Sequence, residues 1–201
     1  LPVGIDPQEA FTKLRKTSRK LAPVVNPDGT LAGILTRKGA VRAKMYRPGV
    51  DKQGRAGLRK YRSNELVTSV GCTQLADGLI DGLVGDGARL FTPGAEIVAV
   101  LDSAGNRHVV ETRKAPRGRR VETIREVIEG SGTVVEYVNG REFSFPATAF
   151  WQAHVAAPEL YSAVAGQWLA GRDYQHETAW DLYGGVGLFV PALSDATGGK
   201  V

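Results

Sequence analysis

The chain has 201 residues, of which 42% are hydrophobic and 23% charged, a composition typical of a globular protein rather than a disordered or fibrous one. The net charge of +5 permits a polyanionic partner, although many basic proteins bind none. A single cysteine excludes an internal disulfide framework. No apolar run reaches the roughly 18 residues that cross a bilayer. We therefore expect a cytoplasmic protein without a membrane partner.

Both ends of the chain indicate a fragment. The first residue is Leu1 rather than methionine, and residues 197–201 resemble a strand that is just beginning. We therefore expect the chain to be a piece of a longer protein. Its 201 residues are enough for one large or two small domains.

Residues 1–40 form a basic N-terminal segment to which we assign no function. Asp6 and Pro7 are typical of a helix start, and cations alternate with apolar residues after them. This pattern predicts a short basic helix, which is either a solvated surface or a face that contacts phosphate. Residues 26–29, Asn-Pro-Asp-Gly, predict a turn.

Residues 41–146 predict a central antiparallel β domain. Short β runs alternate with polar turns, and we expect hairpins over residues 95–112 and 132–145, the second across the Asn-Gly pair at 139–140. Neighbouring strands joined by short turns pair antiparallel. Residues 74–84 have apolar side chains at helical spacing and predict a helix that ends at the glycines after it.

A run of cations lies in what we expect to be one loop between strands of this domain. Such a run is usually solvated, and the alternative is a loop that faces nucleic acid. Its members are Arg113, Lys114, Arg117, Arg119 and Arg120, of which Arg117, Arg119 and Arg120 are the candidates for RNA binding.

Residues 147–201 change to the pattern of an α/β unit, so the predicted fold class is α+β followed by α/β. Apolar residues from Trp151 to Trp168 recur every three or four positions and predict an amphipathic helix with both tryptophans in the core. Residues 178–183 then predict a buried parallel strand, and the glycine turn after it leads into a helix that starts near Leu188. The turn is either a plain connection or a site for a ligand at the carboxyl end of the strand.

Three stretches, taken together, resemble the bacterial RNA uracil-C5 methyltransferases, which use S-adenosylmethionine to form 5-methyluridine in rRNA or tRNA. Residues 57–67, with Cys72 just after, resemble a segment of the central domain of that family. Residues 143–154 resemble the entry to its catalytic domain, and residues 181–187, Asp-Leu-Tyr-Gly-Gly-Val-Gly, resemble its S-adenosylmethionine loop. The resemblance implies that residues 147–201 open a Rossmann-like methyltransferase domain.

The resemblance also implies which residues bind the cofactor. Gln152 would contact it directly, and Asp181 would orient the loop or reach the cofactor through water. His154 and Gly184 depart from the family pattern, in which asparagine and cysteine are usual; we expect His154 to be a supporting or surface residue rather than a base. The implied cofactor-binding positions are Gln152, Asp181, Tyr183, Gly185, Gly187 and Leu188.

In this family a cysteine thiolate adds to C6 of the uracil, which makes C5 nucleophilic, and a carboxylate later removes the C5 proton. Both groups lie downstream of the glycine loop in the family, so we assign no catalytic residue to this chain. Some members hold an iron–sulfur cluster with one cysteine near the position of Cys72 and three upstream. The three are absent here, so Cys72 is either structural or an orphaned ligand, and we expect neither a cluster nor another metal.

Two other functions fit parts of the sequence. The chain is alternatively a basic nucleic-acid-binding module whose glycine turn is only structural. A dinucleotide-dependent oxidoreductase is less favoured, because the turn lacks the full Gly-x-Gly-x-x-Gly spacing.

Overall fold

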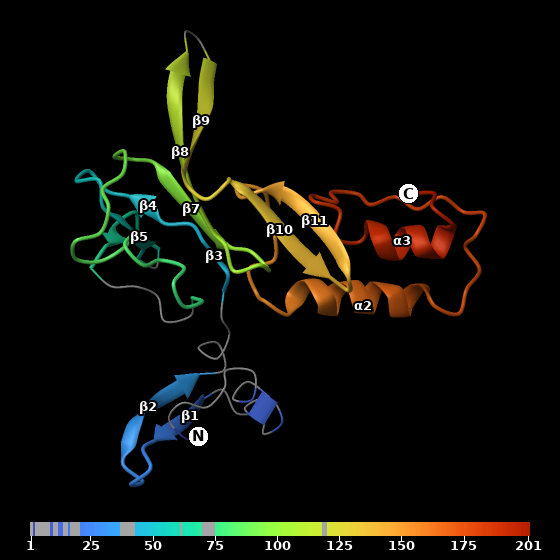
Figure 1. Ribbon diagram of the computed structural model, residues 1–201, viewed down its shortest axis with the longest axis horizontal. Coiled ribbons are helices and arrows are strands. Elements are labelled where there is room, and N and C mark those ends of the chain that lie inside the picture. Colours follow the sequence, from blue (N-terminus) through green and yellow to red (C-terminus); the bar gives the residue numbers. More distant parts are fainter. Residues whose placement is uncertain are drawn as a thin grey trace.

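A computed structural model describes residues 21–36, 43–60, 62–69, 75–117 and 120–201, together with positions 2, 9, 12, 13 and 16 (Figure 1). The four described positions from 9 to 16 are helical, as predicted for the basic segment. The rest of that segment up to residue 20 lies outside the described residues, as do Cys72 and Arg119.

The N-terminal described part is a hairpin of β1 (Leu21–Val25) and β2 (Leu31–Thr36), which pair antiparallel. Its turn confirms the prediction for residues 26–29. Asn26 N–H donates to Thr30 O over 2.9 Å, and Thr30 N–H donates to the Asp28 carboxylate over 2.9 Å.

A seven-stranded sheet forms the centre of the molecule, in the order β6-β5-β4-β7-β8-β9, with β3 also paired to β7. Every pairing within it is antiparallel, which confirms that this part of the chain is an antiparallel β-rich structure. The strands are β3 (Met45–Tyr46), β4 (Gly49–Val50), β5 (Ala56–Arg59), β6 (Leu66–Val67), β7 (Glu96–Leu101), β8 (Arg107–Arg117) and β9 (Arg120–Glu129).

A separate antiparallel hairpin follows, made of β10 (Thr133–Val138) and β11 (Arg141–Pro146). The Asn-Gly pair forms its turn as predicted, with φ of 50° at Asn139 and 76° at Gly140. Two successive positive φ angles give the turn the twist that matches the strands it joins.

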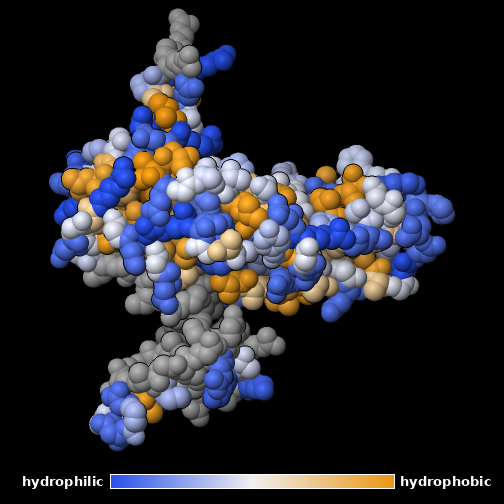
Figure 2. Space-filling view, viewed as in Figure 1, coloured by the Kyte–Doolittle hydropathy of each residue, from blue (hydrophilic) through white to orange (hydrophobic). Residues whose placement is uncertain are grey.

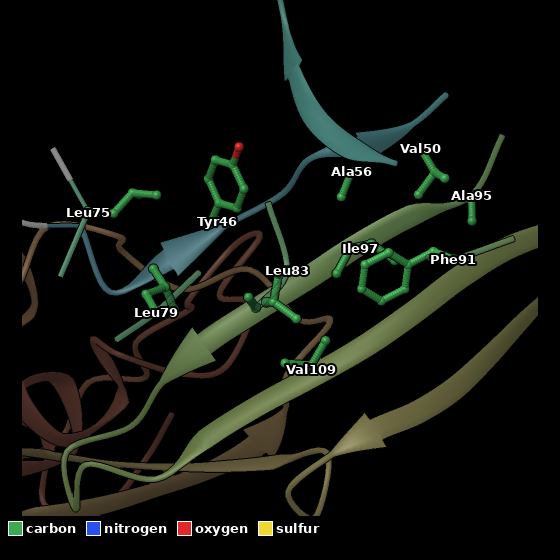
Figure 3. Close-up of a cluster of buried hydrophobic side chains, with 11 residues drawn as sticks. Tyr46, Val50, Ala56, Leu75, Leu79, Leu83, Phe91, Ala95, Ile97 and Val109 are labelled. Atoms are coloured by element: carbon green, nitrogen blue, oxygen red, sulfur yellow. The ribbon is translucent and has the colours of Figure 1, made fainter. Parts of the chain in front are cut away.

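Two hydrophobic clusters lie on opposite faces of β7. Ile97 and Ala99 belong to the first cluster, with Leu79 and Val109 (Figure 3). Val98 belongs to the second, which includes residues of the β10–β11 hairpin. Because alternate side chains of a strand lie on opposite faces, one strand supplies the middle of both clusters.

The predicted helix over residues 74–84 is wrong, because the described residues 77–83 form a series of turns. Gly78 and Gly82 have φ of 78° and 70°, in the left-handed region that a right-handed helix does not use. The apolar spacing nevertheless has a structural basis, since Leu79 and Leu83 are buried in the first cluster.

The predicted basic loop is also wrong. Arg113 and Lys114 lie within β8, Arg120 begins β9, and only residues 118 and 119 separate the two strands. β8 and β9 therefore form a long two-stranded ribbon, which projects from the sheet in Figure 1. Arg113 and Lys114 are adjacent in the sequence, so within β8 they lie on opposite faces of the ribbon.

The C-terminal part contains α2 (Ala157–Leu169) and α3 (Val190–Thr197). Trp151 precedes α2 and is buried, as predicted, but Trp168 is 81% exposed, so its prediction as a core residue is wrong. Neither described helix is long and apolar enough to cross a membrane.

Residues 178–183 are not paired as a strand, and Trp180 and Leu182 are exposed, so the predicted burial of this segment is wrong. One backbone hydrogen bond, from Ala179 N–H to Lys200 O over 2.9 Å, joins the segment to the chain that returns after α3. A single such bond does not make a strand pair, so no neighbouring strand packs beside the segment among the described residues.

Gly78→Ala tests the turns over residues 77–83. No atom lies within 4 Å of the position where the methyl group would sit, so only the backbone resists the change. We expect the free energy of unfolding in urea to fall by about 1 kcal/mol, because φ is positive. Gly166→Ala is the matched control, since it lies inside α2 with equally open surroundings; it should raise stability by about 0.5–1 kcal/mol. A gain for both variants would contradict the turn assignment.

Candidate functional site

A small hollow of about 150 Å³ lies between two segments that are far apart in the sequence. Residues 150–152 form one wall, and residues 181–186 with Leu188 and Phe189 form the rest. The structure thus brings together the two stretches that the sequence assigns to a cofactor.

Aromatic packing positions the first wall. The Trp151 ring lies 4.9 Å from the Phe145 ring and 5.7 Å from the Phe143 ring, measured between centroids. Leu188, from the opposite wall, is buried in the same hydrophobic cluster. Because both walls are anchored in one apolar cluster, the separation between them is fixed by core packing.

The backbone after Trp151 is tied to the central sheet. Lys44 N–H donates to Ala153 O over 3.0 Å, and Ala43 forms an antiparallel bridge with His154. The His154 ring accepts a hydrogen bond at Nδ1 from Ala156 N–H over 3.0 Å, just before α2. His154 therefore supports the chain locally, where it leads into α2.

Gln152 follows this anchor and lines the hollow. It is half-buried, and its side-chain amide makes no hydrogen bond to any described residue. Both ends of the amide, one acceptor and one donor group, are therefore available to a ligand.

Asp181 lines the opposite side and carries the most unusual feature of the site. Its Oδ2 atom is buried and accepts no hydrogen bond from the part of the chain that the structure describes. A buried carboxylate oxygen without a donor costs free energy, so such an atom marks a place where a ligand or water supplies the partner.

Gly184 makes room for this carboxylate. A methyl group on Gly184 would clash with Oδ2 of Asp181 and would lie 2.6 Å from its Cγ atom. The absence of a side chain at Gly184 therefore leaves room for the Asp181 carboxylate to lie against the loop backbone.

The turn itself holds Tyr183 in a left-handed conformation, with φ of 61°. A bulky residue pays about 1–2 kcal/mol for this backbone, and such strain is concentrated at ligand sites. The Tyr183 side chain is fully exposed and borders the hollow, so its ring is free to contact a ligand. Gly185 and Gly187 have φ of 59° and 81°, conformations that favour glycine.

The structure therefore places Gln152, Asp181, Tyr183, Gly185 and Leu188 around one hollow, and Gly187 in the turn beside it. Two exposed apolar residues that we did not expect, Phe150 and Leu182, also line it. Their signal in the sequence is only their adjacency to Gln152 and Asp181.

The size of the hollow limits what it holds. Pockets that enclose a drug-sized ligand measure about 300–1,000 Å³, so the hollow of about 150 Å³ takes part of such a ligand and leaves the remainder on the open surface. Phe150, Leu182 and Tyr183 provide that surface.

The predicted RNA-binding arginines lie elsewhere. Arg117 and Arg120 face each other across the end of the β8–β9 ribbon, and Arg119 falls outside the described residues. Figure 1 shows the end of the ribbon far from the C-terminal segment that forms the hollow.

Other proteins share much of this chain. A protein of Corynebacterium efficiens named an uncharacterized RNA methyltransferase is 56% identical over 160 residues, which are 77% of this chain and 38% of that protein. A protein of the same name from Corynebacterium diphtheriae is 44% identical over 156 residues, 75% of this chain and 37% of that protein. The GMP reductase of Mycobacterium tuberculosis is 34% identical over 114 residues, 57% of this chain and 20% of the reductase.

The chain therefore spans only 38% and 37% of the length of the two relatives that are named RNA methyltransferases. A comparison with models of protein families finds no match.

Asp181→Ala tests whether the buried oxygen lacks a partner. Because the substitution removes an unpaired buried atom, we expect the free energy of unfolding to stay the same or to rise by about 1 kcal/mol. The measurement is urea unfolding of the chain without any ligand.

Asp102→Ala is the control. Burial raises the pKa of Asp102, but hydrogen bonds from Asn106, His108 and Ala104 outweigh it, so the pKa is lowered overall. Loss of this satisfied carboxylate should cost about 2 kcal/mol or more. An equal loss in both variants would show that Asp181 is a structural residue.

Proposed function

Because 77% of the chain is homologous to a segment of a protein named an RNA methyltransferase, we propose that it is part of an enzyme that transfers a methyl group from S-adenosylmethionine to C5 of a uridine in RNA. The observation that carries the proposal is the hollow in which residues 150–152 meet the glycine loop, with an unpaired carboxylate oxygen of Asp181 inside it.

The residues around the hollow fit the cofactor. When bound, S-adenosylmethionine supplies an electrophilic methyl group on a sulfonium centre. Gln152 offers both a donor and an acceptor, Asp181 offers an acceptor, and the glycine turn exposes backbone to close approach. Phe150 and Tyr183 offer exposed aromatic faces that suit a heterocyclic ring or a cation.

We further propose that residues 147–201 open a Rossmann-like domain after a central domain over residues 41–146. The support is the path of the chain: residues 178–183, the glycine turn, α3 and a return that accepts the hydrogen bond of Ala179 at Lys200. A strand–turn–helix–strand unit places a ligand at the turn after its first strand.

The substrate is proposed to be rRNA or tRNA, and the uridine C5 target follows from the family resemblance. We place the thiolate nucleophile and the carboxylate base in the part of the relatives that this chain does not span. The chain alone is therefore expected to bind the cofactor without catalysing methyl transfer. Within the chain, the residues of the hollow bind and orient the methyl donor.

Calorimetry with S-adenosylmethionine tests the proposal against a nucleic-acid-binding module without catalysis. Gln152→Ala should weaken cofactor binding about three- to tenfold, the value of one or two neutral hydrogen bonds, and leave RNA affinity unchanged. Gln167→Ala, an exposed glutamine on α2, is the matched control. RNA binding without any heat from the cofactor would favour the module.

The arginines at the end of the ribbon provide a second test. Replacing Arg117, Arg119 and Arg120 with alanine should flatten the dependence of RNA affinity on salt by roughly 0.7–0.9 in logarithmic slope for each arginine that contacts a phosphate. Fluorescence anisotropy of a labelled RNA at several salt concentrations measures the slope. An unchanged slope would place the end of the ribbon away from RNA.

A further inference from the structure

The two faces of the β8–β9 ribbon differ in charge. Strand register decides which residues share a face, because alternate residues lie on the same side. The first face, which we call the mixed face, holds the cross-strand pairs Glu111–Glu126, Arg113–Ile124, Ala115–Glu122 and Arg117–Arg120. The second, which we call the acid-free face, holds the pairs Val110–Val127, Thr112–Arg125, Lys114–Thr123 and Pro116–Val121.

Cations on the mixed face are balanced by acids. Arg113 lies 3.5 Å from a carboxylate oxygen of Glu111 and 3.4 Å from one of Glu126. A strand of phosphates along the length of this face, below the terminal Arg117–Arg120 pair, would meet the carboxylates of Glu111, Glu122 and Glu126, and repulsion between like charges would oppose it.

The acid-free face has the opposite character. Lys114 and Arg125 are exposed, and neither forms an ion pair with any residue that the structure describes. They occupy adjacent cross-strand pairs, which places them diagonally, with Cβ atoms about 7–8 Å apart. Exposed Val121 and Val127 lie on the same face, so apolar surface alternates with cations; in Figure 2 the projecting ribbon is largely hydrophilic with apolar atoms between.

The acid-free face also continues the side of the sheet that carries the hollow. At the base of the ribbon it begins with Val110, which is buried in the second hydrophobic cluster together with Trp151 and Leu188. The mixed face instead continues from Val109, which belongs to the first cluster (Figure 3). An extended ligand that lies along Lys114 and Arg125 and continues towards the sheet therefore reaches the side on which the glycine loop lies.

We propose that the phosphate backbone of an RNA strand lies along the acid-free face, with Lys114 and Arg125 as its contacts. The proposal rests on the RNA substrate proposed above and specifies where that RNA runs. Phosphates neutralise the charges of Lys114 and Arg125 and so reduce the repulsion between them. The Thr123 hydroxyl donates a hydrogen bond to a phosphate oxygen, and Val121 and Val127 contact sugars or bases. These are positioning contacts, so they supply affinity rather than sequence choice.

The test is the double variant Lys114→Ala/Arg125→Ala in the 201-residue chain. The probes are a labelled RNA stem-loop with uridine in its loop and a single-stranded oligouridine. The slope of logarithmic RNA affinity against logarithmic salt concentration should become shallower by roughly 1.4–1.8 in the variant. The ratio of the RNA affinity of the unaltered chain to that of the variant should therefore shrink about tenfold between about 50 mM and about 200 mM salt.

Lys52→Ala/Arg89→Ala is the matched control, because it removes two exposed cations that lie elsewhere. Its slope should equal that of the unaltered chain. An equal fall in both variants, or no fall in the ribbon variant, would overturn the inference and leave the proposed methyltransferase function standing.

Calorimetry with S-adenosylmethionine on the same variants separates the two proposals. Unchanged cofactor binding in the ribbon variant supports a purely RNA-directed role, and its loss would overturn that role. Absence of RNA binding by the unaltered chain would overturn both the inference and the proposed substrate. Circular dichroism and urea unfolding check that both variants fold, which their exposed positions lead us to expect.

Discussion

The burial of β7 on both faces is the constraint on which the rest of the structure depends. Ile97, Val98, Ala99 and Val100 are all essentially inaccessible, and they alternate between two separate hydrophobic clusters. A strand that is apolar on both sides requires a covering layer on each side. The turns over residues 77–83 cover one side, and the β10–β11 hairpin with Trp151 covers the other. Removal of either layer would expose half of the strand.

The hollow is a consequence of the second layer. Core packing fixes Trp151 against Phe145, and Leu188 reaches the same cluster from beyond α2. Beside these anchors, the side chain of Gln152 makes no hydrogen bond to any described residue, and the glycine loop is held by turn hydrogen bonds such as Gly187 N–H to Gly184 O and by Val186, which packs against the cluster. The apolar side chains of the cluster thus fix the walls of the hollow, whereas the Gln152 amide and the Asp181 Oδ2 atom remain unpaired. Binding sites usually divide stability and function between different residues in this way.

The sequence was sufficient where local chemistry decides the structure. The Asn-Gly turn at 139–140 and the alternating runs beside it predicted the β10–β11 hairpin. The family resemblance of two separate stretches assigned Gln152 and Asp181 to one cofactor site, and the structure places both residues around one hollow. The sequence was insufficient where backbone and side-chain signals disagree: the apolar spacing of residues 74–84 resembles a helix, yet Gly78 and Gly82 adopt left-handed conformations. Trp168 was assigned to the core by its type, but nothing in the described chain covers the face of α2 on which it lies. The ribbon is not predicted because the run of cations over residues 113–120 is typical of a solvated loop.

The missing side chain at Gly184 and the buried, unpaired oxygen of Asp181 are physically linked. With any larger side chain at position 184, the Asp181 carboxylate would be pushed away from the loop backbone and towards solvent, where water would satisfy it. Glycine permits the buried arrangement, so the Asp181 carboxyl group lies closer to the floor of the hollow than a larger side chain at position 184 would allow. A polar group held where water is excluded interacts more strongly with a ligand than the same group in solvent. Gly184 therefore determines how the acid is presented, whereas core packing determines the walls of the hollow.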